Sequence, residues 1–253
     1  MASKLIILGS SNAIPTTGSD NTMLAIITEN SRVLIDSGIN PIVKLDEAGL
    51  DINAFDDIII THFHPDHVSG LPMLLMTMWL TGRKTPITIH GSDHSIDRME
   101  KMMDLFDWDK WPNFFQVDYH RIPHIPSQTI FETTEIHISG TPVNHFIPTI
   151  GLRIHFKLED KVVGYSCDTE PCSGVITIGK EAHLLIHEAT GLEKGHSSAA
   201  QAAETAMRAN AKELLLIHYP TGKYQQKDII EEARQVFTGK ISRAVDMQTI
   251  QID

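Results

Sequence analysis

The segment from Thr61 to His67 places three histidines and one aspartate within seven residues, directly after the apolar run from Ile58 to Ile60. A buried strand that ends at Thr61 would hold the first histidine rigidly. Because side chains alternate along an extended chain, His62 and His64 would lie on one side of it and could bind one metal ion. The sequence therefore predicts a metal site at the end of a buried strand.

Pro65 breaks the extended chain, so Asp66 and His67 can turn toward a second position, where another ion could lie beside the first. Imidazole and carboxylate ligands without a nearby thiolate suit zinc, manganese or iron. The alternative is a polar turn in which Asp66 only caps a helix that begins near Val68. A cap does not require three histidines, so we favour the metal site.

The composition, 42% hydrophobic and 21% charged, is ordinary for a globular protein, and we expect one domain over residues 1 to 253. The formal net charge of -11 disfavours a broad phosphate-binding surface for nucleic acid. Cys167 and Cys172 are too few for a disulfide framework, and no segment has the pattern of a signal peptide or a membrane span. We therefore expect a cytoplasmic protein that does not associate with membranes.

Hydrophobic periodicity predicts strands and helices interleaved along the chain, which is typical of an α/β fold. The predicted strands span residues 4–8, 23–28, 32–36, 57–61, 85–90, 117–121, 135–141, 149–156, 161–165, 184–187 and 213–217. The predicted helices span residues 41–48, 68–81, 93–106, 197–210 and 227–236, with a further short helix before residue 184.

A two-metal site needs more ligands than the first cluster supplies, and we expect them where other strands end. Three polar residues meet this condition because each follows an apolar run: His145, Asp168 and His218. Any one of them alone would more simply be a solvated loop residue. Together with the Thr61 to His67 cluster, the three are favoured as further ligands.

These features resemble the metallo-β-lactamase superfamily, whose mark is the motif H-x-H-x-D-H. Within it, the chain is most similar to the ribonuclease Z group and related phosphodiesterases, and the resemblance covers nearly the whole chain. The matching stretches are residues 8–10, 14–16, 34–38, 61–67, 165–169, 171–172, 187–190 and 195–198, together with His218. The resemblance implies an α/β fold built as a four-layer αββα sandwich, and a metal-dependent hydrolase.

The resemblance also implies a ligand set for two divalent ions, with zinc expected and manganese or iron as alternatives. One ion would be held by His62, His64 and His145, the other by Asp66, His67 and His218, with Asp168 bridging the two. A hydroxide shared between the ions would be the nucleophile near neutral pH. Asp36 corresponds to a supporting carboxylate that orients a ligand histidine or the bridging water, although a turn aspartate is an equal alternative from the residues alone.

Glu188 and His196 carry the information about substrate class. In ribonuclease Z-like enzymes the histidine of a G-H-S-T-like motif contacts the scissile phosphate and is supported by the glutamate of H-E-A-T; this chain has Gly195 to Ser198 and His187 to Thr190. His196 would then assist the leaving oxygen, while Asp66 would orient the nucleophile or take its proton. The alternative is that His196 only flanks a helix starting near Ser197, with Ser197 as its cap.

The chain departs from ribonuclease Z in one respect that bears on the substrate. The family's long basic arm, which grips transfer RNA, commonly lies between the bridging aspartate and the G-H-S-T motif, but only Thr169 to Gly195 separate Asp168 from His196 here. We therefore expect a phosphodiesterase that acts on a small molecule or an RNA end. The sequence leaves the oligomeric state open between a monomer and a homodimer, although relatives are often dimers. The alternatives are a thioester, lactone or sulfate-ester hydrolase, an iron-dependent oxygen enzyme, and a non-catalytic metal-binding protein.

One aromatic cluster has no assigned role in this pattern. Trp108, Trp111, Phe114 and Phe115 follow the helix predicted to end near residue 106. They could wall the substrate cleft and stack on a base. A core lid or a subunit contact is at least as good an interpretation.

Overall fold

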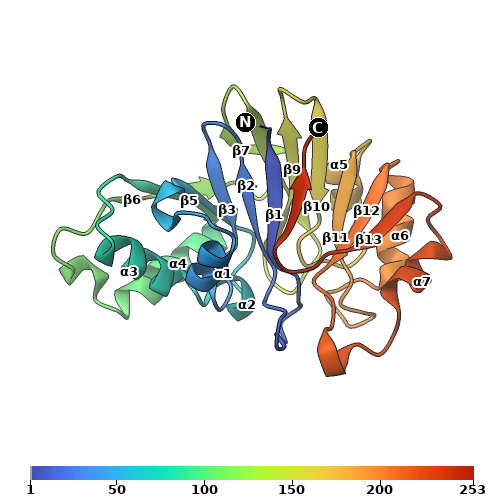
Figure 1. Cartoon of the computed structure of the whole chain (residues 1–253), viewed down its shortest axis with the longest axis horizontal. Coiled ribbons are helices and arrows are strands. Elements are labelled where there is room, and N and C mark those ends of the chain that lie inside the picture. Colours follow the sequence, from blue (N-terminus) through green and yellow to red (C-terminus); the bar gives the residue numbers. More distant parts are fainter. Residues whose placement is uncertain (1) are drawn as a thin grey trace.

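The computed structural model describes residues 2–253, and its centre consists of two seven-stranded sheets (Figure 1). The first sheet has the order β14 (Gln248–Gln251), β1 (Lys4–Gly9), β2 (Met23–Ile27), β3 (Arg32–Ile35), β4 (Asp57–Ile60), β5 (Ile87–Ser92) and β6 (Val117–Ile122). The second has the order β13 (Lys240–Arg243), β12 (Glu213–Ile217), β11 (Leu184–Glu188), β10 (Lys161–Tyr165), β9 (Thr149–Phe156), β8 (Ile136–Val143) and β7 (Gln128–Glu132).

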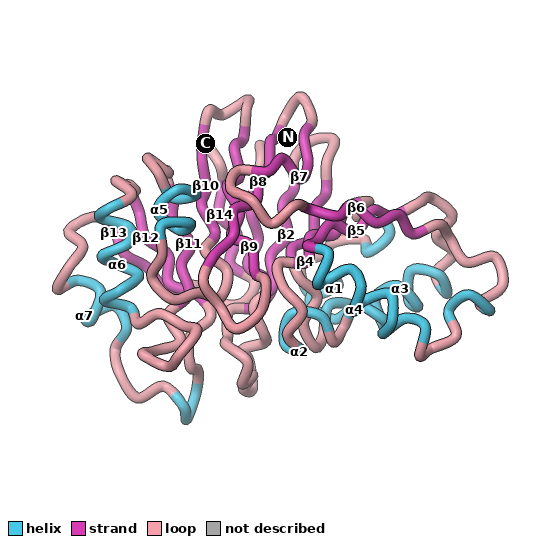
Figure 2. The backbone as a smooth tube through the Cα atoms, turned by 180° about the vertical axis from the view of Figure 1, so that it is seen from behind, coloured by secondary structure: helices cyan, strands magenta, loops and turns pink. Residues whose placement is uncertain are grey.

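Helices flank the two sheets on their outer sides, as both Figure 1 and the reverse view in Figure 2 show. The first sheet carries α1 (Pro41–Glu47), α2 (Pro65–Val68), α3 (Leu71–Leu80) and α4 (Asp93–Asp104), and the second carries α5 (Ser173–Gly179), α6 (Ala199–Arg208) and α7 (Ile229–Arg234). Three short 3-10 helices complete the elements: η1 (Ile52–Ala54), η2 (Trp108–Lys110) and η3 (Gly222–Tyr224).

The layers follow from strands that are buried on both faces. In β4, Ile59 packs in the core between the sheets, while Ile58 and Ile60 pack against the helices outside the first sheet. In β12, Leu215 faces the central core and Leu214 faces the outer helices. Because strand side chains alternate, continuous apolar runs such as these require cover on both faces. The predicted four-layer αββα sandwich is confirmed.

The structure also contains elements that the sequence did not predict. Strands β7, β13 and β14 were not expected, and their side chains are largely half-buried or exposed. The helix predicted over residues 68–81 is instead two helices, α2 and α3, separated at Gly70. The backbone N–H of Gly70 donates to the carbonyl oxygen of Ser37 at 3.0 Å instead of to the preceding turn, which interrupts the helix. A Cβ atom at Gly70 would lie 2.0 Å from the carbonyl oxygen of Gly38, so this close approach requires glycine.

The parallel strands of both sheets direct polar residues to one edge of the sandwich. β3 and β4 are parallel in the first sheet, and β10, β11 and β12 are parallel in the second. The residues just beyond three of these strands, Asp36, Cys167 and His218, have positive φ angles of 62°, 54° and 51°. Such backbone costs energy in residues other than glycine and gathers at functional sites. A functional site is therefore expected at this edge of the sandwich.

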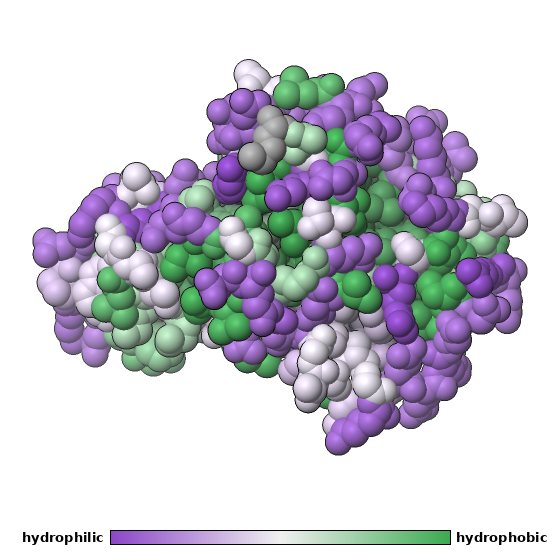
Figure 3. All heavy atoms as spheres, in the orientation of Figure 1, coloured by the Kyte–Doolittle hydropathy of each residue, from purple (hydrophilic) through white to green (hydrophobic). Residues whose placement is uncertain are grey.

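The outer surface is mostly hydrophilic on the face drawn in Figure 3, with hydrophobic side chains in separate patches. Among residues 2–253, no helix has both the length and the apolar character needed to cross a membrane.

Candidate metal centre

Three histidines and an aspartate form the first group of the candidate centre. His62 and His64 follow β4, and His145 follows β8. The Nδ1 atom of His64 lies 3.1 Å from Nε2 of His62 and 3.1 Å from Nε2 of His145. Together with a carboxylate oxygen of Asp168, beyond β10, these atoms all lie within 4.8 Å of one another. Loops from both sheets therefore meet at this point.

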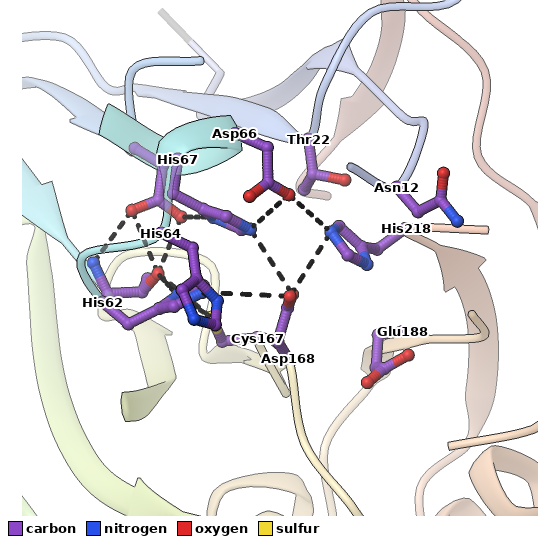
Figure 4. A network of polar contacts seen from close by, with 12 residues as sticks. Asn12, Thr22, His62, His64, Asp66, His67, Cys167, Asp168, Glu188 and His218 are labelled. Atoms are coloured by element: carbon purple, nitrogen blue, oxygen red, sulfur yellow. Dashed lines mark hydrogen bonds and ion pairs between the residues drawn. The ribbon is translucent and has the colours of Figure 1, made fainter. Parts of the chain in front are cut away.

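The second group forms a ring of two carboxylates and two imidazoles, which Figure 4 shows from close by. Oδ2 of Asp66 lies 3.4 Å from Nε2 of His67 and 3.3 Å from Nε2 of His218. On the opposite side, Asp168 places Oδ1 3.5 Å from His67 and Oδ2 3.4 Å from His218. Asp168 belongs to both groups, so it lies between them.

The donor atoms fit two cations. Among residues 2–253, Nε2 of His67 and Oδ1 of Asp168 are buried without a hydrogen-bond partner. Leaving such atoms unpaired is costly, and a cation would satisfy both. Two nitrogens bound to one tetrahedral zinc, each at about 2.0–2.1 Å, lie about 3.3 Å apart, close to the separations in the first group. The buried His/Asp cluster is thus typical of a two-metal site.

Burial and the charges of neighbouring residues together shift the pKa values of the histidines and aspartates in the cluster. Burial lowers the pKa of His62 well below its usual value, and the neighbouring His67 adds to this effect, which keeps the ring neutral as a ligand must be. Burial alone would raise the pKa of Asp168, but His218 and His67 outweigh it and hold that pKa well below its usual range. Asp168 is therefore a carboxylate within a buried cluster.

Asp36 contacts the side of His67 that faces away from the cluster. It is fully buried, and its Oδ2 accepts a hydrogen bond from Nδ1 of His67 at 2.8 Å. Its Oδ1 accepts from the backbone N–H of Thr61 at 2.8 Å, which fixes the carboxylate against the end of β4. The bond to Nδ1 leaves Nε2 of His67 directed into the cluster. The structure thus places Asp36 where a supporting carboxylate was expected.

The loop between β11 and α6, residues 189–198, is joined to the centre by contacts that the sequence did not predict. Nδ1 of His145 donates to the carbonyl oxygen of Gly195 at 2.6 Å, and Oγ1 of Thr190 lies 3.0 Å from Nδ1 of His218. Glu170 accepts from the backbone N–H of Gly195 at 2.8 Å. These contacts join residues that are far apart in the chain, and no sequence motif predicts them.

Glu188 and His196 form a pair beside the second group. Glu188, at the end of β11, is fully buried, and its Oε1 lies 2.9 Å from Nδ1 of His196. Backbone N–H groups of Thr169 and Thr190 donate to the two oxygens of Glu188, at 2.9 Å each. Burial lowers the pKa of His196, but Glu188 outweighs this and raises it above the usual value. One nitrogen atom of His196 lies within 4.8 Å of ligand atoms of Glu188 and His218.

The structure bears on two local alternatives that the sequence left open. The N-cap of α6 is Ser198, which forms a capping box with Gln201, whereas the hydroxyl of Ser197 donates to the carbonyl oxygen of Thr169. The aromatic cluster of residues 108–115 packs against the outer core of the first sheet, where Trp111 stacks on Trp79. The core-lid interpretation of that cluster is the one that its contacts favour.

The structure thus brings together all seven residues predicted as ligands, with Asp36, Glu188 and His196 around them. Their individual roles as ligands and catalytic groups stay predictions.

Comparisons with known proteins agree with this arrangement. A family model described as "Anti-Pycsar protein Apyc1" matches residues 3–241. Ribonuclease Z of Pyrococcus abyssi is 30% identical, covering 85% of each chain. The metallo-beta-lactamase fold protein YhfI from Bacillus subtilis has a TM-score of 0.82 at 21% identity, covering 98% of both chains. The short form of human tRNase Z has a TM-score of 0.81 at 25% identity, covering 99% of both.

The alignment to the Pyrococcus abyssi enzyme spans 268 positions but only 85% of this 253-residue chain, so that relative carries segments that this chain lacks. The match over residues 3–241, the sandwich of two mixed sheets and the buried His/Asp cluster agree with one another. The chain belongs to the family of the anti-Pycsar protein Apyc1, within the metallo-β-lactamase-fold hydrolases related to ribonuclease Z.

Proposed function

We propose that this protein is a two-metal phosphodiesterase that hydrolyses a small phosphodiester, of the cyclic nucleotide class that its family suggests. The observation that carries the proposal is the Glu188 and His196 pair beside the His/Asp cluster, with 2.9 Å between Oε1 and Nδ1. Attack by water on a carbonyl carbon would need the metals but not this pair. A phosphodiester needs a proton for its leaving oxygen, and an imidazolium held by a carboxylate supplies one.

Each residue of the centre has a defined part in this proposal. His62, His64, His145, Asp66, His67, His218 and the shared Asp168 would hold the ions. Bound divalent ions would supply a water of lowered pKa and positive charge opposite the phosphate. Asp66, whose Oδ2 faces both His67 and His218, would orient that water or take its proton. His196 would stabilise the charge on the phosphate and donate a proton to the leaving oxygen.

The short connection between Asp168 and His196 supports a small substrate. Residues 169–195 form only α5, β11 and the loops around them, so no arm projects between the two catalytic segments. The net charge of -11 also disfavours a long contact with an RNA backbone. A cyclic nucleotide needs neither an arm nor a basic surface.

The test is an assay of the zinc- or manganese-loaded protein with 3′,5′-cyclic nucleotides, bis(4-nitrophenyl) phosphate, a thioester and a precursor transfer RNA. We expect turnover of the cyclic nucleotides and of the chromogenic diester, and little of the thioester or the RNA. His196→Ala should lower kcat on the diesters by roughly 10²- to 10⁴-fold while the bound metal stays constant. His124→Ala, at an exposed histidine outside the centre, is the matched control.

Absence of diester turnover in the metal-loaded protein would refute the proposal. Preferential turnover of the thioester would favour the alternative class of hydrolase on the same scaffold. If His196→Ala kept full diester activity while His62→Ala abolished it, the role given to His196 would be wrong.

A further inference from the structure

Thr61 directly follows the buried strand β4, and hydrogen bonds of its backbone hold it to both sheets. Its N–H donates to Oδ1 of Asp36 at 2.8 Å, and its carbonyl oxygen accepts from the N–H of Ile150, in β9 of the second sheet, at 3.1 Å. The residue is fully buried. These backbone contacts fix the position of Thr61 without its hydroxyl, so the contacts of the hydroxyl need a separate explanation.

The hydroxyl of Thr61 contacts a carboxylate, an imidazole and a thiol. Its Oγ1 lies 2.8 Å from Oδ2 and 3.0 Å from Oδ1 of Asp36. It also lies 3.2 Å from Nδ1 of His62 and 3.0 Å from Sγ of Cys167, which lies beside the His62 ring in Figure 4. A hydroxyl has one proton to donate and two lone pairs that accept. Each of these contacts can therefore be assigned a direction.

The direction of each contact follows from what Asp36 can do. A carboxylate only accepts hydrogen bonds, so the single proton of Thr61 is directed to Asp36. The oxygen of Thr61 then has only lone pairs for its other neighbours. The thiol of Cys167 donates to one of them, and Nδ1 of His62 donates to the other. His62 therefore carries its proton on Nδ1, and its Nε2 has none.

An Nε2 atom without a proton is what the first group requires of His62. This atom lies 3.1 Å from Nδ1 of His64 and 3.9 Å from Oδ2 of Asp168, so it faces the expected position of the first ion. A histidine that binds a metal usually donates its other N–H to an oxygen atom, which fixes the tautomer and orients the ring. The hydroxyl of Thr61 is that oxygen atom for His62.

We propose that the hydroxyl of Thr61 connects Asp36 to His62, so that one buried carboxylate positions a ligand of each ion. Asp36 holds His67, the ligand expected at the second ion, directly through Nδ1 at 2.8 Å. It holds His62, the ligand expected at the first ion, through Thr61. Thr61 is thus a positioning residue for the centre. This inference rests on the two-metal centre of the proposed function, but it does not depend on which substrate that centre hydrolyses.

Two other arrangements of the hydrogen atoms compete with this one. Either the hydroxyl of Thr61 or, from 3.5 Å, the thiol of Cys167 could donate to Nδ1 of His62. Both arrangements place the proton of His62 on Nε2, where it would block metal binding. The first also leaves Asp36 without the proton of Thr61, and the second uses a longer contact than the 3.0 Å from Sγ to Oγ1. The tautomer of His62 therefore distinguishes the three arrangements from one another only in part, but it separates the proposed one from both others.

Thr61→Val and Thr61→Ser separate the role of the hydroxyl from that of side-chain packing. Valine keeps the branched shape and loses the oxygen, whereas serine keeps the oxygen and loses the methyl group. Stepwise competition of a chromogenic chelator for cobalt(II) or zinc measures the affinity for each ion. We expect Thr61→Val to lower the affinity for one of the two ions roughly 10- to 100-fold, and Thr61→Ser to bind both nearly as the wild type does.

Two further variants complete the comparison. Asp36→Asn should weaken the binding of both ions, because Asp36 holds His67 directly and His62 through Thr61. Thr205→Val is the matched control, because it removes a buried hydroxyl that donates to a carbonyl oxygen within α6, away from the centre. We expect Thr205→Val to leave both affinities unchanged.

The second measurement needs no variant. Long-range proton–nitrogen NMR correlations of the zinc-loaded protein, labelled with nitrogen-15 histidine, identify the protonated nitrogen of each imidazole. We expect His62 to carry its proton on Nδ1. A proton on Nε2 of His62 would overturn the inference, and so would full affinity in Thr61→Val. If the variants bind as expected but the wild type turns over no diester, only the proposed function is overturned.

Discussion

At the residue scale, the same device appears twice: a buried carboxylate holds a histidine by Nδ1. Asp36 binds His67 at 2.8 Å, and Glu188 binds His196 at 2.9 Å. Asp36 also accepts one backbone N–H and Glu188 accepts two, so the orientation of each carboxylate is fixed. The two histidines differ in surroundings, because the side chain of His67 is fully buried whereas that of His196 is 17% exposed. The buried His67 is suited to bind a metal ion, and the partly exposed His196 is suited to contact a substrate.

Asp36→Asn tests the support of His67. The amide keeps the shape of the side chain but cannot accept from Nδ1 of His67 with the strength of a carboxylate. We expect metal affinity, measured by competition with a chromogenic chelator, to fall roughly 10- to 100-fold. Asp118→Asn, at an exposed aspartate on β6, is the control. Unchanged affinity in Asp36→Asn would mean that Asp36 is only a turn residue.

Glu188→Gln tests the support of His196. Loss of the carboxylate removes the charge that keeps the pKa of His196 raised and weakens the bond that orients the ring. We expect kcat for a diester to fall at least about 10-fold, with a smaller change in KM and with bound metal constant by elemental analysis. Glu204→Gln, exposed on α6, should behave as the wild type. A loss of metal equal to the loss of activity would contradict the role assigned to Glu188.

At the scale of elements, the sequence predicted the strand ends that carry the centre but not the loop that completes it. β4, β10 and β12 are apolar runs, and their ends were evident from the pattern. The contact of His145 with Gly195 joins residues 50 positions apart, and only the three-dimensional fold creates it. β13 and β14 were missed because their short, partly exposed sequences lack the apolar character that marks the central strands.

Gly195→Ala tests how closely the loop before α6 packs against Phe146. Gly195 has φ of 81°, and a Cβ atom there would lie 2.6 Å from the ring of Phe146. Gly18 has the same φ of 81° but nothing within 4 Å of its Cβ position, so Gly18→Ala isolates the cost of the backbone conformation. We expect Gly18→Ala to lose about 1 kcal/mol of unfolding free energy with activity kept.

Gly195→Ala should lose more unfolding free energy and also displace His196, with diester kcat falling at least about 10-fold. Denaturant titration and steady-state kinetics on both variants give the comparison. Equal activity in the two variants would show that the loop tolerates displacement and that its fit to Phe146 has no part in catalysis.

At the scale of the whole molecule, the candidate centre joins the two halves of the sandwich. His62 follows β4 of the first sheet and His67 lies in α2 just beyond it, while Asp168 and His218 follow β10 and β12 of the second sheet. The four-layer arrangement was predicted from the resemblance to the metallo-β-lactamase superfamily. The apolar runs alone require only that both faces of a strand be covered, which a single sheet between two layers of helices also achieves. The ligand residues come from both sheets because the edges of the two sheets that carry them lie side by side. Local sequence patterns do not show that these two edges meet.

Metal removal should therefore loosen the packing between the sheets as well as stop catalysis. Ions that bind only the folded protein stabilise it by about 4 kcal/mol each at a thousand times their Kd. For a chain of this size, one such ion corresponds to a rise in Tm of roughly 8 to 16 °C. Thermal unfolding of the protein with chelator and with added zinc or manganese measures this rise. Asp168→Asn, which alters the residue common to both groups, should remove most of it. An equal Tm with and without bound metal would show that the sheets pack independently of the centre, and that Nε2 of His67 and Oδ1 of Asp168 are satisfied in some other way.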